Sequence, residues 1–145
     1  MREDGNRGNL INYQKELDKI IEACIRNGCV PSLLLHSCCA PCSSYTLEYL
    51  SQFFKITIYY YNPNVYPEEE FGKRVEEQKR LIDEMGLDVK YQLGKYDPER
   101  FFELAKGLED QPEGGERCFK CYRLRLEEAA RIAKEGDFDY FTTTL

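Results

Sequence analysis

The first regular pattern in the chain is a set of apolar residues spaced three or four positions apart. They are Leu10, Tyr13, Leu17, Ile20, Ile21 and Cys24. Side chains at this spacing share one face of a helix, and Gly28 then supplies a stop. The pattern predicts an amphipathic helix ending at Gly28, with Cys24 on its apolar face as a small packing residue.

A short apolar run comes next and is followed by a segment rich in small residues. Leu33–Leu35 lies before the turn segment Ser37–Cys42, so it is predicted to be a buried strand. Ser43 or Ser44 can cap a helix that reaches about Phe53, because a hydroxyl oxygen accepts a bond from the free N–H groups of a first turn. The expected order is strand, loop, helix.

The rest of the chain repeats this order. β-Branched and aromatic residues mark strands, a proline followed by glutamates opens a helix, and acidic residues with Gly and Pro mark a loop. The expected strands are Lys55–Tyr61, Asp88–Leu93 and Tyr140–Thr144. The expected helices run from Pro67 to Gly86, briefly from Asp97, and from about Cys118 to Lys134, with a loop at Gly107–Gly115.

Strands that alternate with helices are typical of an α/β fold, with a parallel sheet covered by helices on both faces. A chain of 145 residues suits a single domain over 1–145. Such sheets bind ligands at the carboxyl ends of their strands. The Cys38 loop, the turn Asn62-Pro63-Asn64 and Thr142–Thr144 are expected to meet at that edge.

The sequence contains seven cysteines, and their expected role depends on the compartment in which the protein resides. Met1–Gly8 is polar rather than a signal peptide, and no apolar run reaches the roughly 20 residues of a membrane helix. We therefore expect a cytoplasmic protein without a membrane partner. In that reducing compartment, spaced cysteines indicate metal or redox chemistry rather than structural disulfides.

Two Cys-x-x-Cys pairs carry the strongest signal. Cys39 and Cys42 follow Cys38 at a junction from strand to helix, and Cys118 and Cys121 form the second pair. Helix N-termini favour thiolates, and the basic side chains next to the second pair act in the same direction. The five cysteines are therefore the candidate metal ligands and catalytic residues.

The spacing and the number of these five cysteines limit the kinds of metal site that they can form. Cys42 and Cys118 lie 76 positions apart, which does not fit the short spacing of zinc ribbons. Five thiolates exceed the four that one zinc ion or one fully thiolate-ligated 4Fe–4S cluster uses. A cluster with one other or open position, plus a second metal, would use all five. Asp110 is a candidate for that position, whereas His36 is expected to be a hydrogen-bonded packing residue.

The remaining features leave alternatives open. The net charge of −6 argues against unspecific coating of nucleic acid, but Glu116–Arg125 carries a local charge of +3 and is either a phosphate-binding patch or a solvated helix face. Tyr61 and Tyr66 could stack on a base. A thioredoxin-like thiol oxidoreductase would use only Cys39 and Cys42. A zinc-stabilised module that binds RNA would use the basic stretch.

Three segments resemble one family, the cobalamin-independent epoxyqueuosine reductases called QueH. They are His36-Ser37-Cys38-Cys39-Ala40-Pro41-Cys42, Tyr61-Asn62-Pro63-Asn64 and the stretch from Glu113 to Leu126. The resemblance implies a Rossmann-like sheet of the nucleotide-hydrolase superfamily. It also implies reduction of epoxyqueuosine to queuosine at the wobble position of tRNA, the last step of queuosine biosynthesis, by an iron–sulfur cluster and a neighbouring iron.

The resemblance assigns roles to residues as well. It implies that Cys38, Cys39, Cys42, Cys118 and Cys121 bind a 4Fe–4S cluster and a mononuclear iron, for which zinc is a possible substitute. Asn62 and Asn64 are expected near the tRNA substrate, with Arg117, Tyr122 and Arg125 as further substrate-binding candidates. The electron donor stays open. Members of the family continue past the threonine strand, so the chain is expected to be truncated at its C-terminus relative to them.

Overall fold

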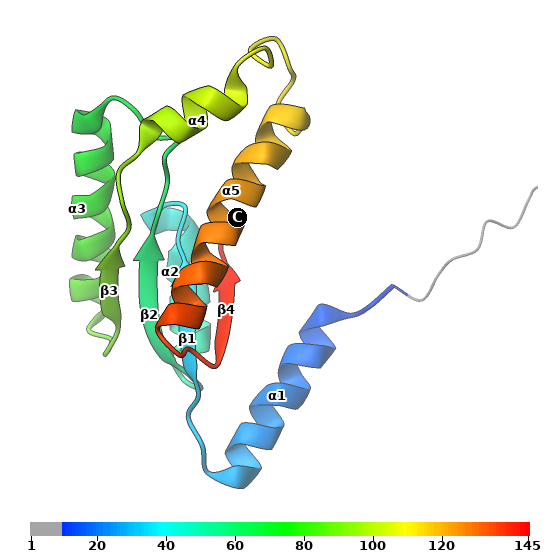
Figure 1. Ribbon diagram of the computed structural model, residues 1–145. Helices are drawn as coiled ribbons and strands as arrows, with labels where there is room; N and C mark the ends of the chain where they lie inside the picture. Colours follow the sequence, from blue (N-terminus) through cyan, green and yellow to red (C-terminus); the bar gives the residue numbers. More distant parts are fainter. Residues whose placement is uncertain (1–9) are drawn as a thin grey trace, which may run out of the picture. The chain divides into compact units, whose positions relative to one another are not determined.

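A computed structural model describes residues 10–145 (Figure 1). They divide between Val30 and Pro31 into two compact units. The expectation about Met1–Gly8 falls outside the described residues. None of the described helices has the length and apolar character needed to cross a membrane.

The first unit contains helix α1, Tyr13–Asn27. The side chain of Asn12 accepts a hydrogen bond from the backbone N–H of Lys15 at 3.1 Å and caps the first turn. Gly28 ends the helix with a φ of 64°, and its N–H donates to the carbonyls of Cys24 and Ile25. Glycine suits this left-handed position because it has no Cβ. The predicted first helix is confirmed.

The second unit is built on a four-stranded, all-parallel sheet (Figure 1). Its order is β3-β2-β1-β4, so β1 lies inside the sheet between β2 and β4. Leu33, Leu34 and Leu35 of β1 are buried, as expected for a central strand covered on both faces. The strands are β1 Ser32–His36, β2 Lys55–Tyr60, β3 Lys90–Leu93 and β4 Tyr140–Thr143.

Helices cover both faces of this sheet. On one face, Tyr60 of β2 packs against Phe71 and Val75 of α3, whereas on the other face Tyr59 packs in a cluster with Ala129 of α5. The predicted α/β, Rossmann-like architecture is thereby confirmed. The helices of this unit are α2 Ala40–Leu50, α3 Glu68–Met85, α4 Pro98–Ala105 and α5 Glu116–Glu135.

The start of α2 differs from the prediction. The helix begins at Ala40 with Cys39 at the capping position, so Ser43 and Ser44 do not cap it. Pro41 lies in the first turn, where its fixed φ and missing N–H suit a helix start. The helix also ends at Leu50 rather than near residue 53. The consequence is that Cys42 belongs to the first turn of α2 rather than to the loop before it.

The start of α5 shifts in the same direction. The helix begins at Glu116, two residues before the expected Cys118, and Gly115 occupies the capping position. A Cβ at Gly115 would lie 2.8 Å from the carbonyl oxygen of Pro112, so the tight turn before α5 favours glycine there. Cys118 and Cys121 therefore lie within the first two turns of α5.

Candidate metal centre

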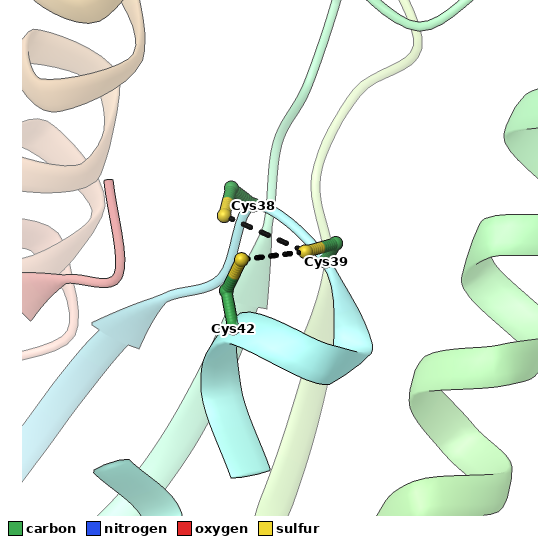
Figure 2. A group of neighbouring side chains, drawn as sticks. All are labelled: Cys38, Cys39 and Cys42. Atoms are coloured by element: carbon green, nitrogen blue, oxygen red, sulfur yellow. Dashed lines mark hydrogen bonds between the residues drawn. The ribbon is translucent and has the colours of Figure 1, made fainter. Parts of the chain in front are cut away.

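Three cysteine sulfurs lie together where β1 passes into α2 (Figure 2). The Sγ atoms of Cys38, Cys39 and Cys42 are all within 4.8 Å of one another. Cys38 Sγ is 3.8 Å from Cys39 Sγ, and Cys39 Sγ is 2.9 Å from Cys42 Sγ. The turn before α2 and the first turn of the helix thus direct three thiol groups toward one point.

The spacing of these sulfurs fits shared ligation of one metal. Two sulfurs on a tetrahedral metal with bonds of about 2.3 Å lie about 3.8 Å apart. The Cys38 to Cys39 distance of 3.8 Å agrees with that value, and the 2.9 Å between Cys39 and Cys42 would open by roughly 1 Å. Thiolates are also the usual ligands of iron–sulfur clusters. The donor set therefore fits a thiolate-ligated metal group.

Electrostatics within the group favour one thiolate. Burial opposes ionisation of Cys39, but hydrogen bonds from Cys42 and Cys38 outweigh it and lower the pKa of Cys39. The same hydrogen bond to Cys39, with a further one to Cys38, raises the pKa of Cys42 to about 12. Arg74 on α3 adds a favourable positive charge for the Cys39 thiolate. Of the pair Cys39 and Cys42, Cys39 is therefore the thiol that ionises more easily.

His36 forms hydrogen bonds beside the cysteine loop and is not a member of the three-cysteine group. Its side chain is fully buried, and Nε2 lies 2.8 Å from the carbonyl oxygen of Tyr61, which can only accept, so Nε2 donates. Nδ1 then accepts from the hydroxyl of Thr143 at 2.9 Å. Burial lowers the pKa of His36 to about 4, so the ring is neutral at pH 7. Both ring nitrogens are occupied, which confirms the expected packing role.

Three strand ends meet at this site, as the sequence predicted. The side-chain amide of Asn62, which follows β2, donates to the carbonyl of Ser37 at 2.9 Å. The backbone N–H of Cys38 donates to the hydroxyl of Thr144, after β4, at 3.1 Å. That hydroxyl also lies 3.4 Å from Cys38 Sγ. The carboxyl edge of the sheet therefore holds the cysteine loop from two sides.

The second cysteine pair lies apart from the group of three. Cys118 and Cys121 are on α5 and line a cavity of about 610 Å³. Burial raises the pKa of Cys121, partly opposed by Arg125, while Cys118 Sγ accepts a hydrogen bond from the N–H of Gly114 at 3.4 Å. Neither sulfur belongs to the cluster of described ligand atoms that lie within 4.8 Å of one another.

The cavity collects most of the other candidate residues. Its size falls within the 300 to 1,000 Å³ typical of small-molecule sites. Of the predicted substrate-binding residues, Asn64, Arg117, Tyr122 and Arg125 line it, and so does Tyr66. Asp110 is exposed and does not line it. Its neighbour Glu109 does, and the Glu109 carbonyl accepts from Arg117 at 3.1 Å.

Two aromatic residues of the cavity were missed at the sequence level. Phe101 and Phe102 of α4 line it, and the ring of Phe102 lies 4.9 Å from that of Tyr66 between centroids. The sequence shows them only as apolar positions of a short helix. Their role depends on where α4 lies, and the sequence has no local signal for that position.

Arg125 links the cavity to the cysteine loop. Its Nη1 donates to Asn62 Oδ1 at 3.2 Å, and Asn62 in turn donates to the Ser37 carbonyl next to Cys38. Arg125 is only 5% exposed, so it is not part of a solvated basic face. Arg125 Nε and Asn64 Oδ1 are buried without a hydrogen-bond partner among the described residues. A polar ligand in the cavity could satisfy such atoms.

Part of the positive charge in the stretch Glu116–Arg125 is paired with glutamates on the same helix. Lys120 forms an ion pair with Glu116 at 3.5 Å, and Arg123 forms one with Glu127 at 2.7 Å. Arg117 and the buried Arg125 are the two basic residues of this stretch that line the cavity. The ion pairs offset part of the positive charge of α5, and the choice between a phosphate-binding patch and a solvated helix face stays open.

Residues 33–145 match the family described as epoxyqueuosine reductase QueH. The chain belongs to the QueH family. Curated relatives that carry the name epoxyqueuosine reductase QueH agree with this assignment. The protein from Staphylococcus epidermidis is 45% identical over 93% of this chain, and that from Staphylococcus aureus is 41% identical over 93%. The protein from Streptococcus pyogenes serotype M1 is 38% identical over 97%.

The match covers only part of each QueH relative. It spans 59% of the two staphylococcal proteins and 56% of the streptococcal one. The matched part of this chain nevertheless includes both cysteine groups and the cavity, since all of these residues lie within 33–145. Within this QueH chain, the three-cysteine group is the arrangement able to hold a metal ion among the described residues.

Proposed function

We propose that this chain forms the metal-binding part of a reductase that converts epoxyqueuosine to queuosine at the wobble position of tRNA. The observation that carries the proposal is the group of three sulfurs within 4.8 Å at the carboxyl edge of the sheet. QueH relatives bear the name of this activity. In the proposal, the five thiolates of Cys38, Cys39, Cys42, Cys118 and Cys121 hold a 4Fe–4S cluster and a mononuclear iron between them.

The proposed reaction balances as a two-electron deoxygenation. Both C–O bonds of the epoxide break, a C=C bond forms, and two electrons with two protons convert the oxygen into water. An external low-potential donor supplies the electrons. When bound, the iron group supplies a Lewis acid for the epoxide oxygen and a route for single electrons.

The protein's own residues bind and orient in this scheme. The lowered pKa of Cys39 favours its thiolate, which is the form of cysteine that binds metal. Tyr66 and Tyr122 offer faces on which a base can stack, and Arg117 offers a positive charge for a phosphate. Asn62 and Arg125 connect this cavity to the cysteine loop by hydrogen bonds. Substrate in the cavity would thus lie beside the protein groups that support the metal.

The alternatives predict different metal contents. A thioredoxin-like oxidoreductase would need only Cys39 and Cys42, whose sulfurs lie 2.9 Å apart, and would hold no metal. A zinc-stabilised module would hold zinc alone. Iron with acid-labile sulfide in anaerobically purified protein supports the reductase proposal, and either other result contradicts it.

Serine variants of the five cysteines test the site. Replacing any one should reduce iron and sulfide content and lower queuosine formation by at least about tenfold, since serine is a poor ligand for these metals. The assay combines the chain with a low-potential reductant and epoxyqueuosine-containing tRNA, followed by nucleoside analysis. Cys29→Ser is the matched control, because Cys29 is exposed in the first unit.

Two results would count against the proposal. Full iron and sulfide content without queuosine, in protein of the full length of the QueH relatives, would exclude the reductase activity. Full activity of Cys121→Ser would remove that residue from the site.

A further inference from the structure

One buried polar side chain in the second unit has no role in the proposed chemistry. Phe71, Val75, Gln78 and Ile82 are the buried residues of α3, spaced as one helix face. Gln78 is the polar member of this set and is fully buried. Burying an amide costs free energy unless hydrogen bonds compensate it, so a packing role alone would favour an apolar residue here.

The Gln78 amide bonds to residues on both sides of the cysteine loop. Its Oε1 accepts from the hydroxyl of Ser37 at 2.6 Å, and its Nε2 donates to the hydroxyl of Ser43 at 3.2 Å. Ser37 directly precedes Cys38, and Ser43 directly follows Cys42. Both serines are fully buried. A single side chain from α3 therefore ties together the two ends of the metal-binding segment.

The direction of these bonds is consistent with the rest of the network. Ser43 Oγ donates its one hydrogen to the carbonyl of Ala40 at 2.9 Å, which leaves it free to accept from Gln78 Nε2. The backbone N–H of Ser43 donates to the Cys39 carbonyl at 3.2 Å. Through Ser43, Gln78 thus supports the first turn of α2, the turn that carries Cys42.

We propose that Gln78 is a positioning residue that holds the Cys38–Cys42 segment in its metal-binding conformation by bridging Ser37 and Ser43. This rests on the proposed function in taking the three cysteines as a metal site. Gln78 acts through the two serines, which are its hydrogen-bond partners, rather than as a metal ligand. Its contribution is to hold the three thiols close together before metal arrives, which lowers the ordering cost of binding.

The test compares Gln78→Met with Ile82→Ala in the full chain. Methionine keeps the length and removes both hydrogen bonds, while Ile82→Ala weakens packing on the same helix face without touching the loop. Hydrogen exchange of the segment from Cys38 to Leu47, measured without metal, should be at least about tenfold faster in Gln78→Met than in Ile82→Ala. Equal exchange in the two variants would overturn the proposal.

Anaerobic titration with Co(II), followed by its thiolate absorption band, gives a second readout. Gln78→Met should bind Co(II) on the order of 10- to 100-fold more weakly than wild type, as for other residues that orient metal ligands. Unchanged affinity would also overturn the positioning role. Wild-type protein without Co(II) binding would instead contradict the metal centre itself, while the exchange comparison would still decide the role of Gln78.

Should Gln78→Met not fold, Ser43→Ala removes the Nε2 contact from the other side. It should accelerate exchange in the same segment, and unchanged exchange in Ser43→Ala would overturn the bridge. Where Gln78→Met does fold, the double variant should add little to the effect of either single change. Independent, additive effects would contradict a bridge made by one amide.

Discussion

Individual residues at this site are specialised by their surroundings rather than by type. Cys39 and Cys42 lie three positions apart, yet their mutual hydrogen bond lowers the pKa of one thiol and raises that of the other. Cys121 differs again, because burial in α5 raises its pKa. The number of cysteines in the sequence does not reveal that these three thiols differ in pKa.

His36 yields a prediction about pH and stability. Its pKa is about 4 in the folded protein and about 6.5 when unfolded, so the unfolded chain binds more protons between these values. The contribution of His36 is complete above pH 6.5 and falls by about 3 kcal/mol as pH drops toward 4. Urea unfolding of metal-free protein across this range should show the loss.

The matched variant for that measurement is His36→Gln, which keeps a donor for the Tyr61 carbonyl but does not titrate. The unfolding free energy of His36→Gln should depend less steeply on pH. The difference in slope should correspond to about one proton fewer taken up on unfolding. Identical slopes for the two proteins would show that His36 is not buried in its neutral form.

At the level of elements, close approach of α5 to the sheet positions the second cysteine pair. Ala129 and Ala133 are buried against Leu34, Tyr59 and Tyr61. Small side chains let the helix axis come near the strands, and this packing determines where the N-terminal turns of α5 lie. Those turns carry the cysteines that line the cavity.

Enlarging this contact should be costly. Ala129→Leu forces extra volume into a fully buried position and is expected to lower the free energy of unfolding by about 1 to 3 kcal/mol. Lys134→Leu, at an exposed position of the same helix, should change it by less than about 0.5 kcal/mol. Denaturant midpoints of both variants give the comparison, and equal midpoints would contradict tight packing at Ala129.

Across the second unit, Asn62 is the connection between the two cysteine groups. It donates to the Ser37 carbonyl beside Cys38 and accepts from Arg125 of α5, which lies one turn from Cys121. Sequence distances of 25 and 63 residues separate Asn62 from these partners. Its fully buried position leaves water unable to replace either bond.

Asn62→Ala should therefore destabilise the protein by about 1 to 3 kcal/mol, because it leaves a buried guanidinium short of a partner. The loosened Arg125 should also slow the alkylation of Cys121, measured by mass spectrometry, because Arg125 counteracts the rise in the pKa of this thiol and the thiolate is the reactive form. Asn64→Ala serves as the control. Asn64 Oδ1 already lacks a partner among the described residues, so removing it should cost less than about 1 kcal/mol. Equal costs for both variants would contradict the bridging role.

Much of the second unit was predictable from local sequence. The strands at Leu33–Leu35 and Lys55–Tyr61 and the helix after Pro67 were recognised because apolar periodicity and turn residues act over a few positions. Parallel alternation then places every strand's carboxyl end at one edge, so the meeting of Cys38, Asn62 and Thr144 also followed from the sequence.

Tertiary structure alone decided how these pieces meet. Gln78 reaches Ser37 and Ser43 across 41 and 35 residues, and Phe102 of α4 meets Tyr66 from a separate segment of the chain. Spacing within Cys-x-x-Cys pairs likewise did not show that Cys118 and Cys121 lie outside the group of three. Such contacts depend on the packing of helices against the sheet, and packing is set by side chains far apart in the chain rather than by any local pattern.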